Sequence, residues 1–256
     1  MTARKIILTV ILVAAATTAV LSFKWRSGGD LTKITVTGNY TVQREEILRA
    51  ARLNDTATSW DEINIDNIRD RILKNPEVKK VYVSKEMPSE LEIEILERRP
   101  IAILNGENEI RLVDEELETF PFRNSSKMYD LPVISGVRIE QSPKGAKNYS
   151  HEDLRLAVFM ILNIYSTSKM IYNNVSEVNL SDSTMAVVYL SEDSSPFYFP
   201  RRYHESISNI DYRNEVTGSI AIFENYLQQY LDVHLKKHVN YVDVRFGNQV
   251  IVNSNN

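Results

Sequence analysis

The sequence predicts an α+β protein in which an N-terminal transmembrane helix precedes two folded domains. Three observations support this prediction: a long apolar run near the N-terminus, a strand-helix-helix-strand-strand pattern after it, and short strands mixed with two amphipathic helices in the rest of the chain. We expect the second domain to be mixed α/β, with an antiparallel sheet that ends in a C-terminal β-hairpin. The predicted parts are a cytoplasmic tail (1–5), the transmembrane helix (6–23), a linker (24–30), the two domains (31–99 and 100–252) and a tail (253–256).

The apolar run near the N-terminus extends from Ile6 to Phe23 and holds 18 residues without a charge, glycine or proline. As a helix it would be roughly 27 Å long, close to the thickness of a membrane's hydrocarbon core. We therefore expect a membrane anchor in which Ile6, Leu12, Val20 and Phe23 face lipid. A cleaved signal peptide is the alternative, because basic residues precede the run and small residues lie within it.

Charged residues flank the run on both sides, with Arg4 and Lys5 before it and Lys24 and Arg26 after it. The basic pairs balance, and the free amino group favours a cytoplasmic N-terminus. The simplest prediction is a single-pass protein with most of its chain outside the cytoplasm.

The overall composition excludes several classes of protein. Thirty basic and 34 acidic residues give a net charge of −4, which does not suit a nucleic-acid-binding surface. The absence of cysteine excludes disulfide scaffolds, cysteine nucleophiles, thiolate zinc sites and iron–sulfur clusters. We expect no cofactor.

The first domain is predicted from its apolar periodicity. A strand over Leu31–Thr37 ends in the turn Gly38-Asn39, and Thr41 is the expected N-cap of a helix through Arg52. A second helix follows Asn64 and ends before Pro76. Strands over Val78–Val83 and Leu91–Leu96 complete the domain. In the last strand glutamates alternate with buried aliphatic residues, which indicates a solvated face rather than a catalytic carboxylate pair.

Several short motifs in this domain occur in the order found in POTRA domains, and most closely resemble the FtsQ/DivIB family of bacterial division proteins. They are Val36-Thr37-Gly38-Asn39, Glu46-Ile47, Asn75-Pro76-Glu77-Val78-Lys79-Lys80-Val81, Pro88 with Leu91, and Glu97-Arg98-Arg99-Pro100-Ile101-Ala102. The resemblance implies a non-enzymatic scaffold at the division septum, anchored in the cytoplasmic membrane. The partners it implies are FtsB- and FtsL-like bitopic proteins and, through them, the septal peptidoglycan synthase.

The second domain is predicted to contain strands at 101–104, 110–113, 131–135, 175–180 and 185–190. Helices are expected from His151 to Ser168, with Ser150 as a possible cap, and from Val216 to His234. Strands over 241–246 and 249–252, joined by a turn at Gly247-Asn248, resemble the closing hairpin of the same family.

Enzyme motifs are absent from the sequence: it has no P-loop, dinucleotide-binding, nucleophile-elbow or HExxH pattern. His234 and His238 have the spacing of metal ligands on a helix, but no third ligand is suggested nearby, and a solvated helix end is favoured. Two alternatives to the scaffold stay open, a POTRA-containing transport or assembly factor of the cell envelope and an anchored extracytoplasmic enzyme.

The candidate binding site is the closing hairpin. Val250, Ile251 and Val252 are β-branched and lie near the end of the chain, so we expect an uncovered strand edge that accepts a strand from another chain. The resemblance implies that FtsB adds its strand here, and the predicted contact residues are Arg245, Phe246, Gln249, Val250, Ile251 and Val252. The alternative is that these residues only pack the end of the domain.

Overall fold

The computed structural model describes residues 9–19, 30–53, 59–106, 109–122, 129–141, 147–192, 195–236, 239–247 and 249–254. Residues 9–19 form a helix within the predicted anchor. No helix in the described ranges is long and apolar enough to cross a membrane. The chain divides into two compact units, Met1–Arg98 and Arg99–Asn256.

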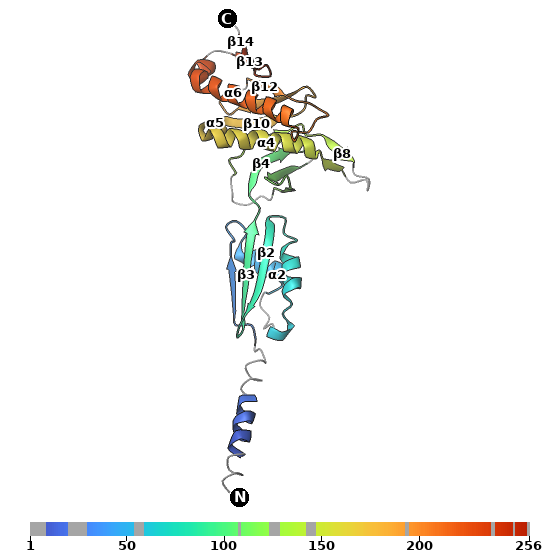
Figure 1. Cartoon of the computed structure of the whole chain (residues 1–256), viewed down its shortest axis with the longest axis vertical. Helices are drawn as coiled ribbons and strands as arrows, with labels where there is room; N and C mark the ends of the chain where they lie inside the picture. The colour runs from blue at the N-terminus through green and yellow to red at the C-terminus, as the bar shows by residue number, and fades with distance from the viewer. Residues whose placement is uncertain are drawn as a thin grey trace. The chain divides into compact units, whose positions relative to one another are not determined.

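The first unit has the element order that the sequence predicts (Figure 1). Strand β1 (Lys33–Thr37) is followed by α2 (Arg44–Ala51), the short 3₁₀ helix η1 (Trp60–Glu62), α3 (Ile65–Ile72), β2 (Val78–Glu86) and β3 (Glu90–Glu97). The sheet order is β1-β3-β2, with β1 parallel and β2 antiparallel to β3. Helices α2 and α3 pack against each other, and α3 packs against β2.

Strand β3 shows why this unit folds. Leu91, Ile93 and Ile95 are buried in the core, whereas Glu92 and Glu94 are exposed. The predicted assignment of the glutamates to a solvated face is therefore confirmed. Because neither helix is long enough to be stable alone, the buried face of the sheet and the helices stabilise one another.

The motif residue Glu97 ties the end of β3 to the loop before α2. Its carboxylate accepts hydrogen bonds from the backbone N–H groups of Thr41 (2.8 Å) and Val42 (2.7 Å), and from the Thr41 hydroxyl. The prediction that Thr41 caps the helix is wrong, because its hydroxyl is bound to Glu97 and α2 begins at Arg44, after Gln43. Asn64 does cap α3, accepting from Asn67 N–H at 3.0 Å.

Two further motifs in the first unit are also explained by contacts. Asn75 donates to the Glu46 carboxylate at 3.0 Å and accepts from the Glu77 N–H at 3.1 Å, which joins α2 to the turn before β2. Gly38 has φ +76, and a Cβ there would overlap the Ile95 carbonyl, so no other residue fits that turn.

The second unit is built on one sheet of nine strands, with helices packed on it. Its order is β14-β13-β12-β11-β10-β7-β4-β5-β6. The elements in chain order are β4 (Pro100–Asn105), β5 (Ile110–Asp114), β6 (Thr119–Pro121), β7 (Val133–Ser135), β8 (Ile139–Gln141), β9 (Lys147–Tyr149), α4 (His151–Thr167), α5 (Lys169–Asn174), β10 (Val175–Asn179), β11 (Met185–Leu190), β12 (Phe197–Pro200), α6 (Ile210–Lys236), β13 (Val239–Asp243) and β14 (Ile251–Ser254).

The prediction of an antiparallel sheet is wrong, because the sheet is mixed. Strand β7 is parallel to both β4 and β10, and β12 is parallel to β13. Two of these pairs enclose helices: α4 and α5 lie between β7 and β10, and α6 lies between β12 and β13. Parallel neighbours need such long crossover connections. The β13–β14 pair is antiparallel, as expected for the closing hairpin.

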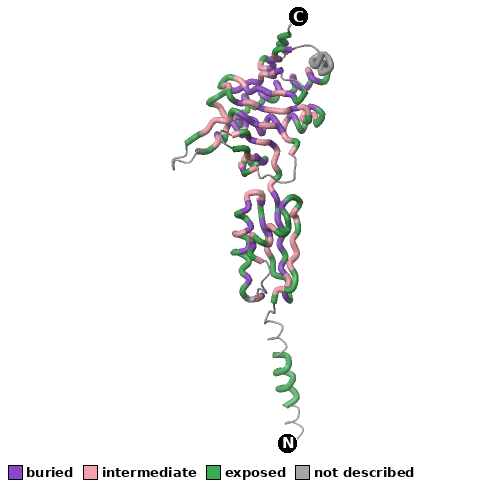
Figure 2. The backbone as a smooth tube through the Cα atoms, turned by 180° about the vertical axis from the view of Figure 1, so that it is seen from behind, coloured by how far each residue is buried: buried purple, intermediate pink, exposed green. Residues whose placement is uncertain are grey.

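The core of the second unit lies between the sheet and its helices. Figure 1 shows α4 and α6 side by side, and Figure 2 shows the buried residues gathered in the interior of this unit. Phe223 of α6 meets Phe197 and Phe199 of β12 edge to face, with ring centroids 4.9 and 5.4 Å apart. These contacts fix α6 over the strands next to β13 and β14.

Several elements of the second unit differ from prediction. Helix α6 begins at Ile210 rather than Val216, after Asn209, whose side chain accepts from the Asp211 and Tyr212 N–H groups. Helix α5 and the strands β6, β8, β9 and β12 were not predicted, because each is too short to show periodicity. Ser150 precedes α4, but its hydroxyl makes no capping hydrogen bond.

Glu224 of α6 predicts a pH effect on stability. It is buried, and one of its carboxyl oxygens has no hydrogen-bond partner within the described part of the chain. Burial raises the pKa of this carboxyl above its ordinary value. The folded state therefore holds the proton to higher pH than the unfolded state, so ionisation of Glu224 lowers stability as pH rises through the ordinary pKa toward the raised one.

We expect Glu224→Gln to raise the free energy of unfolding near pH 7, by up to about 1 kcal/mol, and to flatten its decline between acid and neutral pH. Urea unfolding of the wild type and the variant at a series of pH values measures both effects. Glu140→Gln, at an exposed position on β8, is the matched control and should leave the profile unchanged.

Candidate partner-binding edge

Strand β14 is the last strand of the nine-stranded sheet. It pairs with β13 through Val242 opposite Val252 and Asp243 opposite Ile251, and no described strand pairs with its other side. All four of its residues are exposed, as the segment leading to the C-terminus shows in Figure 2. One side of β14 therefore presents backbone N–H and C=O groups to an incoming strand.

The two β-branched residues at the start of β14 lie on opposite faces of the sheet. Val252 lies opposite the buried Val242, whereas Ile251 lies opposite Asp243. Ile251 is 42% and Val252 44% exposed, so each offers apolar surface on its own face. An added strand would meet one apolar side chain on each face.

The limits of the closing strands differ from prediction. Strand β13 spans Val239–Asp243 rather than 241–246, and β14 spans Ile251–Ser254 rather than 249–252. The physical reason is at Asp243, whose side chain accepts from the Arg245 N–H at 3.0 Å and turns the chain out of the strand. Gln249 and Val250 thus belong to the connection; Gln249 is exposed, and Val250 packs against the core.

Arg245 and Asp243 form a two-point ion pair beside this edge. The Arg245 Nε and Nη2 atoms donate to the two carboxylate oxygens at 2.9 and 2.7 Å. Burial alone would raise the pKa of Asp243, but the hydrogen bonds from Arg245 outweigh it and lower that pKa. The pair therefore holds the β13–β14 connection in one geometry over the neutral pH range.

Aromatic side chains surround Arg245. Its guanidinium lies over the rings of Tyr198 (5.9 Å) and Phe246 (5.7 Å), and the Tyr198 ring stacks on Tyr241 with centroids 5.2 Å apart. Phe246 is exposed. Sequence reasoning named Arg245 and Phe246 but missed Asp243, Tyr198 and Tyr241. Only the Asp-x-Arg spacing could have indicated the ion pair, since Tyr198 comes from a distant strand.

The structure therefore brings the six predicted contact residues together at one end of the sheet. Phe246, Ile251 and Val252 are exposed, and Arg245 lies over the rings of Tyr198 and Phe246. The arrangement offers an open strand edge with apolar, aromatic and cationic groups beside it. Such a surface is suited to binding another polypeptide.

The predicted anchor residues are only partly within the described ranges. Leu12 lies in the helix at 9–19 and is exposed, whereas Ile6, Val20 and Phe23 lie outside the described residues. The side chain of His234 and all of His238 also lie outside them.

Comparison with known proteins shows which family the first unit resembles. Residues 30–98 match the family model described as "POTRA domain, FtsQ-type". The cell division protein FtsQ of Geotalea daltonii is 24% identical over 87% of this chain and 74% of its own length. Residues 30–98 therefore form an FtsQ-type POTRA domain, and the longer chain is similar to FtsQ division proteins. The resemblance that the motifs of the first unit carry is confirmed.

Other FtsQ proteins are similar to this chain over only part of their own length. The FtsQ of Rickettsia felis is 33% identical over 39% of this chain and 37% of its own length. The FtsQ of Koribacter versatilis is 22% identical over 86% of this chain and 59% of its own. This similarity to FtsQ proteins supports a role in bacterial cell division.

Proposed function

We propose that this chain is a membrane-anchored, non-enzymatic scaffold of the bacterial division apparatus, and that it binds FtsB- and FtsL-like bitopic proteins. The bulk of the chain lies outside the cytoplasmic membrane at the septum. Binding takes place by strand addition at β14, and it helps to recruit or regulate septal peptidoglycan synthesis. The single observation that carries the proposal is the uncovered edge of β14 with its exposed Ile251 and Val252.

The two ends of the large sheet differ in a way that favours β14. At the opposite end β6 has three residues, and one of them is Pro121, which has no N–H to donate to another strand. Natural proteins protect sheet edges with short strands and prolines. Strand β14 holds four residues and has no proline among them, so each of its outward backbone groups can pair with an added strand.

The ion pair at the end of β13 supports the same proposal. Association costs less when the binding surface already has its bound geometry. The contacts of Asp243 and Tyr198 with Arg245 fix the connection before β14. The edge is thus presented in a defined position.

The variant Ile251→Pro tests this function. Proline removes the Ile251 N–H, which faces Asp243 of β13, and restricts φ, so it displaces β14 from the end of the sheet. We therefore expect the variant to lose capture of the FtsB-like protein by at least about tenfold. The measurement is co-purification of the tagged full-length chain from membranes, with the bound FtsB- and FtsL-like proteins quantified.

The matched control is Ile251→Thr, which keeps the backbone donor and the β-branched shape and should retain most of the binding. Thermal unfolding of both variants verifies that the two units stay folded. A folded Ile251→Pro variant that still retains its partners would place the binding edge elsewhere.

A further inference from the structure

Glu224 of α6 is a buried carboxyl group without an ion-pair partner. It is 5% exposed, and its Oε1 atom has no hydrogen-bond partner in the part of the chain that the structure describes. Two other carboxylates of the second unit, Glu152 and Glu215, also have a buried oxygen, but each is paired with an arginine. No described cation offsets the cost of ionising Glu224.

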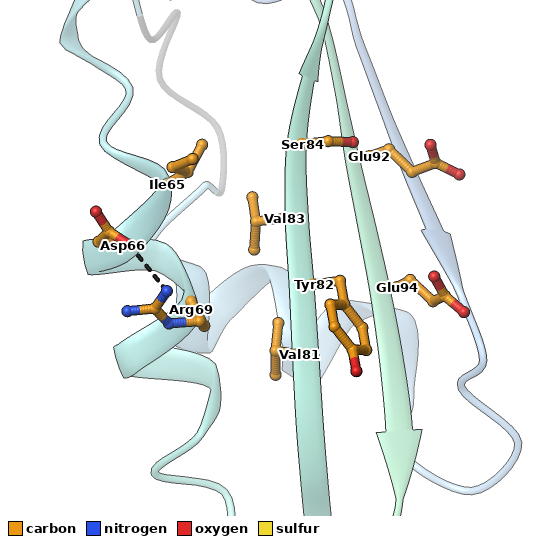
Figure 3. A pocket seen from close by; sticks show the side chains of 9 residues that line it. All are labelled: Ile65, Asp66, Arg69, Val81, Tyr82, Val83, Ser84, Glu92 and Glu94. Atoms are coloured by element: carbon orange, nitrogen blue, oxygen red, sulfur yellow. Dashed lines mark ion pairs between the residues drawn. The ribbon is translucent and has the colours of Figure 1, made fainter.

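The acidic residues that line a cavity in the first unit are placed differently. This cavity of about 420 Å³ is lined by Asp66 of α3 and by Glu92 and Glu94 of β3 (Figure 3). All three residues are exposed, and Asp66 is also paired with Arg69 at 2.9 Å. Water or a cation stabilises their ionised forms, whereas Glu224 is shielded from water and has no described cation beside it.

The polar group that faces the Glu224 carboxyl from α4 is the hydroxyl of Thr167, the last residue of that helix. This hydroxyl donates its single hydrogen to the Asn163 carbonyl at 3.1 Å. Toward Glu224 it can therefore only accept a hydrogen bond, and only a protonated carboxyl can donate one. The chain of hydrogen bonds from Glu224 through Thr167 to Asn163 is complete when Glu224 holds its proton.

The surroundings of Glu224 favour the protonated form. Burial raises the pKa of its carboxyl. A hydrogen bond donated by Thr167 would lower that pKa, but the hydrogen is already donated to Asn163. The end of α4 is also the negative end of its helix dipole. The charged residue of α5, Lys169, lies over the Tyr165 ring at 5.6 Å and makes no contribution to the shift.

We propose that Glu224 and Thr167 form a proton-dependent latch between α6 and the last turn of α4. With the proton in place, the hydrogen bond between the two side chains holds the helices together. On ionisation, the carboxylate and the Thr167 oxygen repel each other, and the carboxylate turns toward water. The latch is closed below the ordinary pKa of a glutamate and opens as pH rises through the raised pKa.

The position of Glu224 in α6 connects the latch to the sheet. The preceding residue, Phe223, meets Phe197 and Phe199 of β12 edge to face. Strand β12 pairs with β13, and β13 pairs with β14. Opening of the latch displaces the turn of α6 that carries Phe223, so it loosens β12. This regulation does not depend on the identity of a partner.

Amide hydrogen exchange of the full-length chain at pH 5 and pH 8 tests the latch, with each rate divided by its intrinsic value at that pH. We expect protection of residues 220–228 and 197–199 to fall about threefold or more at the higher pH, since one pKa unit corresponds to a tenfold change. Small additions of urea separate this local opening, which they leave unchanged, from global unfolding. Equal protection at the two pH values would overturn the latch, and a response confined to α6 would overturn its connection to β12.

Glu224→Gln imitates the closed latch, because its amide N–H can donate to the Thr167 hydroxyl at any pH. We expect this variant to keep its protection at pH 8. Thr167→Val removes the acceptor, and it should lower protection about threefold at pH 5 while changing little at pH 8, where the latch is already open.

Thr167→Ser is the matched control, since it retains the hydroxyl and should keep the pH profile of the wild type. A loss of protection in Thr167→Val that is equal at both pH values would show that Thr167 has only a structural role. That result would overturn the proposal.

Discussion

Replacement of Ile93 by aspartate is expected to unfold the first unit of this chain. Ile93 is 0% exposed at the centre of β3, where it packs against the core under α2 and α3. The variant loses the buried aliphatic side chain and places a carboxyl group in its position. We expect a loss of about 3–5 kcal/mol, which is a large part of the stability of so small a unit.

The matched control for this change is Leu96→Asp, on the same strand but at an exposed position. It should unfold at nearly the same denaturant concentration as the wild type. Urea unfolding followed by circular dichroism measures both variants. Equal destabilisation by the two substitutions would mean that the faces of β3 are assigned incorrectly.

The variant Asp153→Asn is expected to destabilise the second unit by a similar amount. The Asp153 carboxylate is 3% exposed and accepts from Arg138 Nε at 2.8 Å and from Arg201 Nη2 at 2.8 Å. The side chain of Arg201 is itself buried and also donates to the carbonyls of Leu180 and Asp182. Without the carboxylate, the buried guanidinium of Arg201 loses its ion-pair partner, which costs about 3–5 kcal/mol.

The same network predicts how stability depends on acid. Burial alone would raise the pKa of Asp153, but hydrogen bonds from Arg138 and the charge of Arg201 outweigh it and lower that pKa. The stabilisation is therefore present above the ordinary pKa of an aspartate and is lost as pH falls toward the lowered value. The asparagine variant should lack this acid-dependent component.

Glu205→Gln provides the comparison for Asp153→Asn, because Glu205 pairs with Arg202 at the surface. We expect it to cost less than about 1 kcal/mol. Unfolding in guanidinium chloride, measured at several pH values from 7 down to 3, compares the wild type with the two variants. A small effect of Asp153→Asn would show that the buried network does not hold α4 to the loops beside it.

The first unit could be predicted well because its signals are local. Strict alternation in β3, the N-cap at Asn64 and the glycine at position 38 each follow from neighbouring residues. The role of Thr41 could not be predicted in this way, because Glu97, which binds it, lies 56 residues away. Capping propensity at Thr41 was outweighed by this distant contact.

The second unit was predicted less well because its topology depends on distant pairing. The alternation in β4, β7 and β10 predicts strands, but it does not indicate that β7 pairs in parallel with β4 and with β10. Strand β12 holds four residues and is almost wholly apolar, so it lacks a period that would distinguish strand from helix.

The outer position of β14 agrees with the expectation of a strand edge at Val250, Ile251 and Val252. The groups that hold it in place could not be predicted. Tyr198 contacts Arg245 from β12. Strand β12 pairs with β13 in the sheet, but α6 separates the two strands in the sequence. Electrostatic and aromatic contacts between distant strands leave no periodic signal in the sequence.

The central claim is that β14 accepts a strand from an FtsB-like partner. The most direct measurement is amide hydrogen exchange of residues 251–254 in the full-length chain, alone and in complex with that partner. Strand addition predicts that these amides exchange much more slowly in the complex, while those of the core strand β11 keep their rates. Unchanged exchange at 251–254 in a chain that is fully bound to its partner would contradict it.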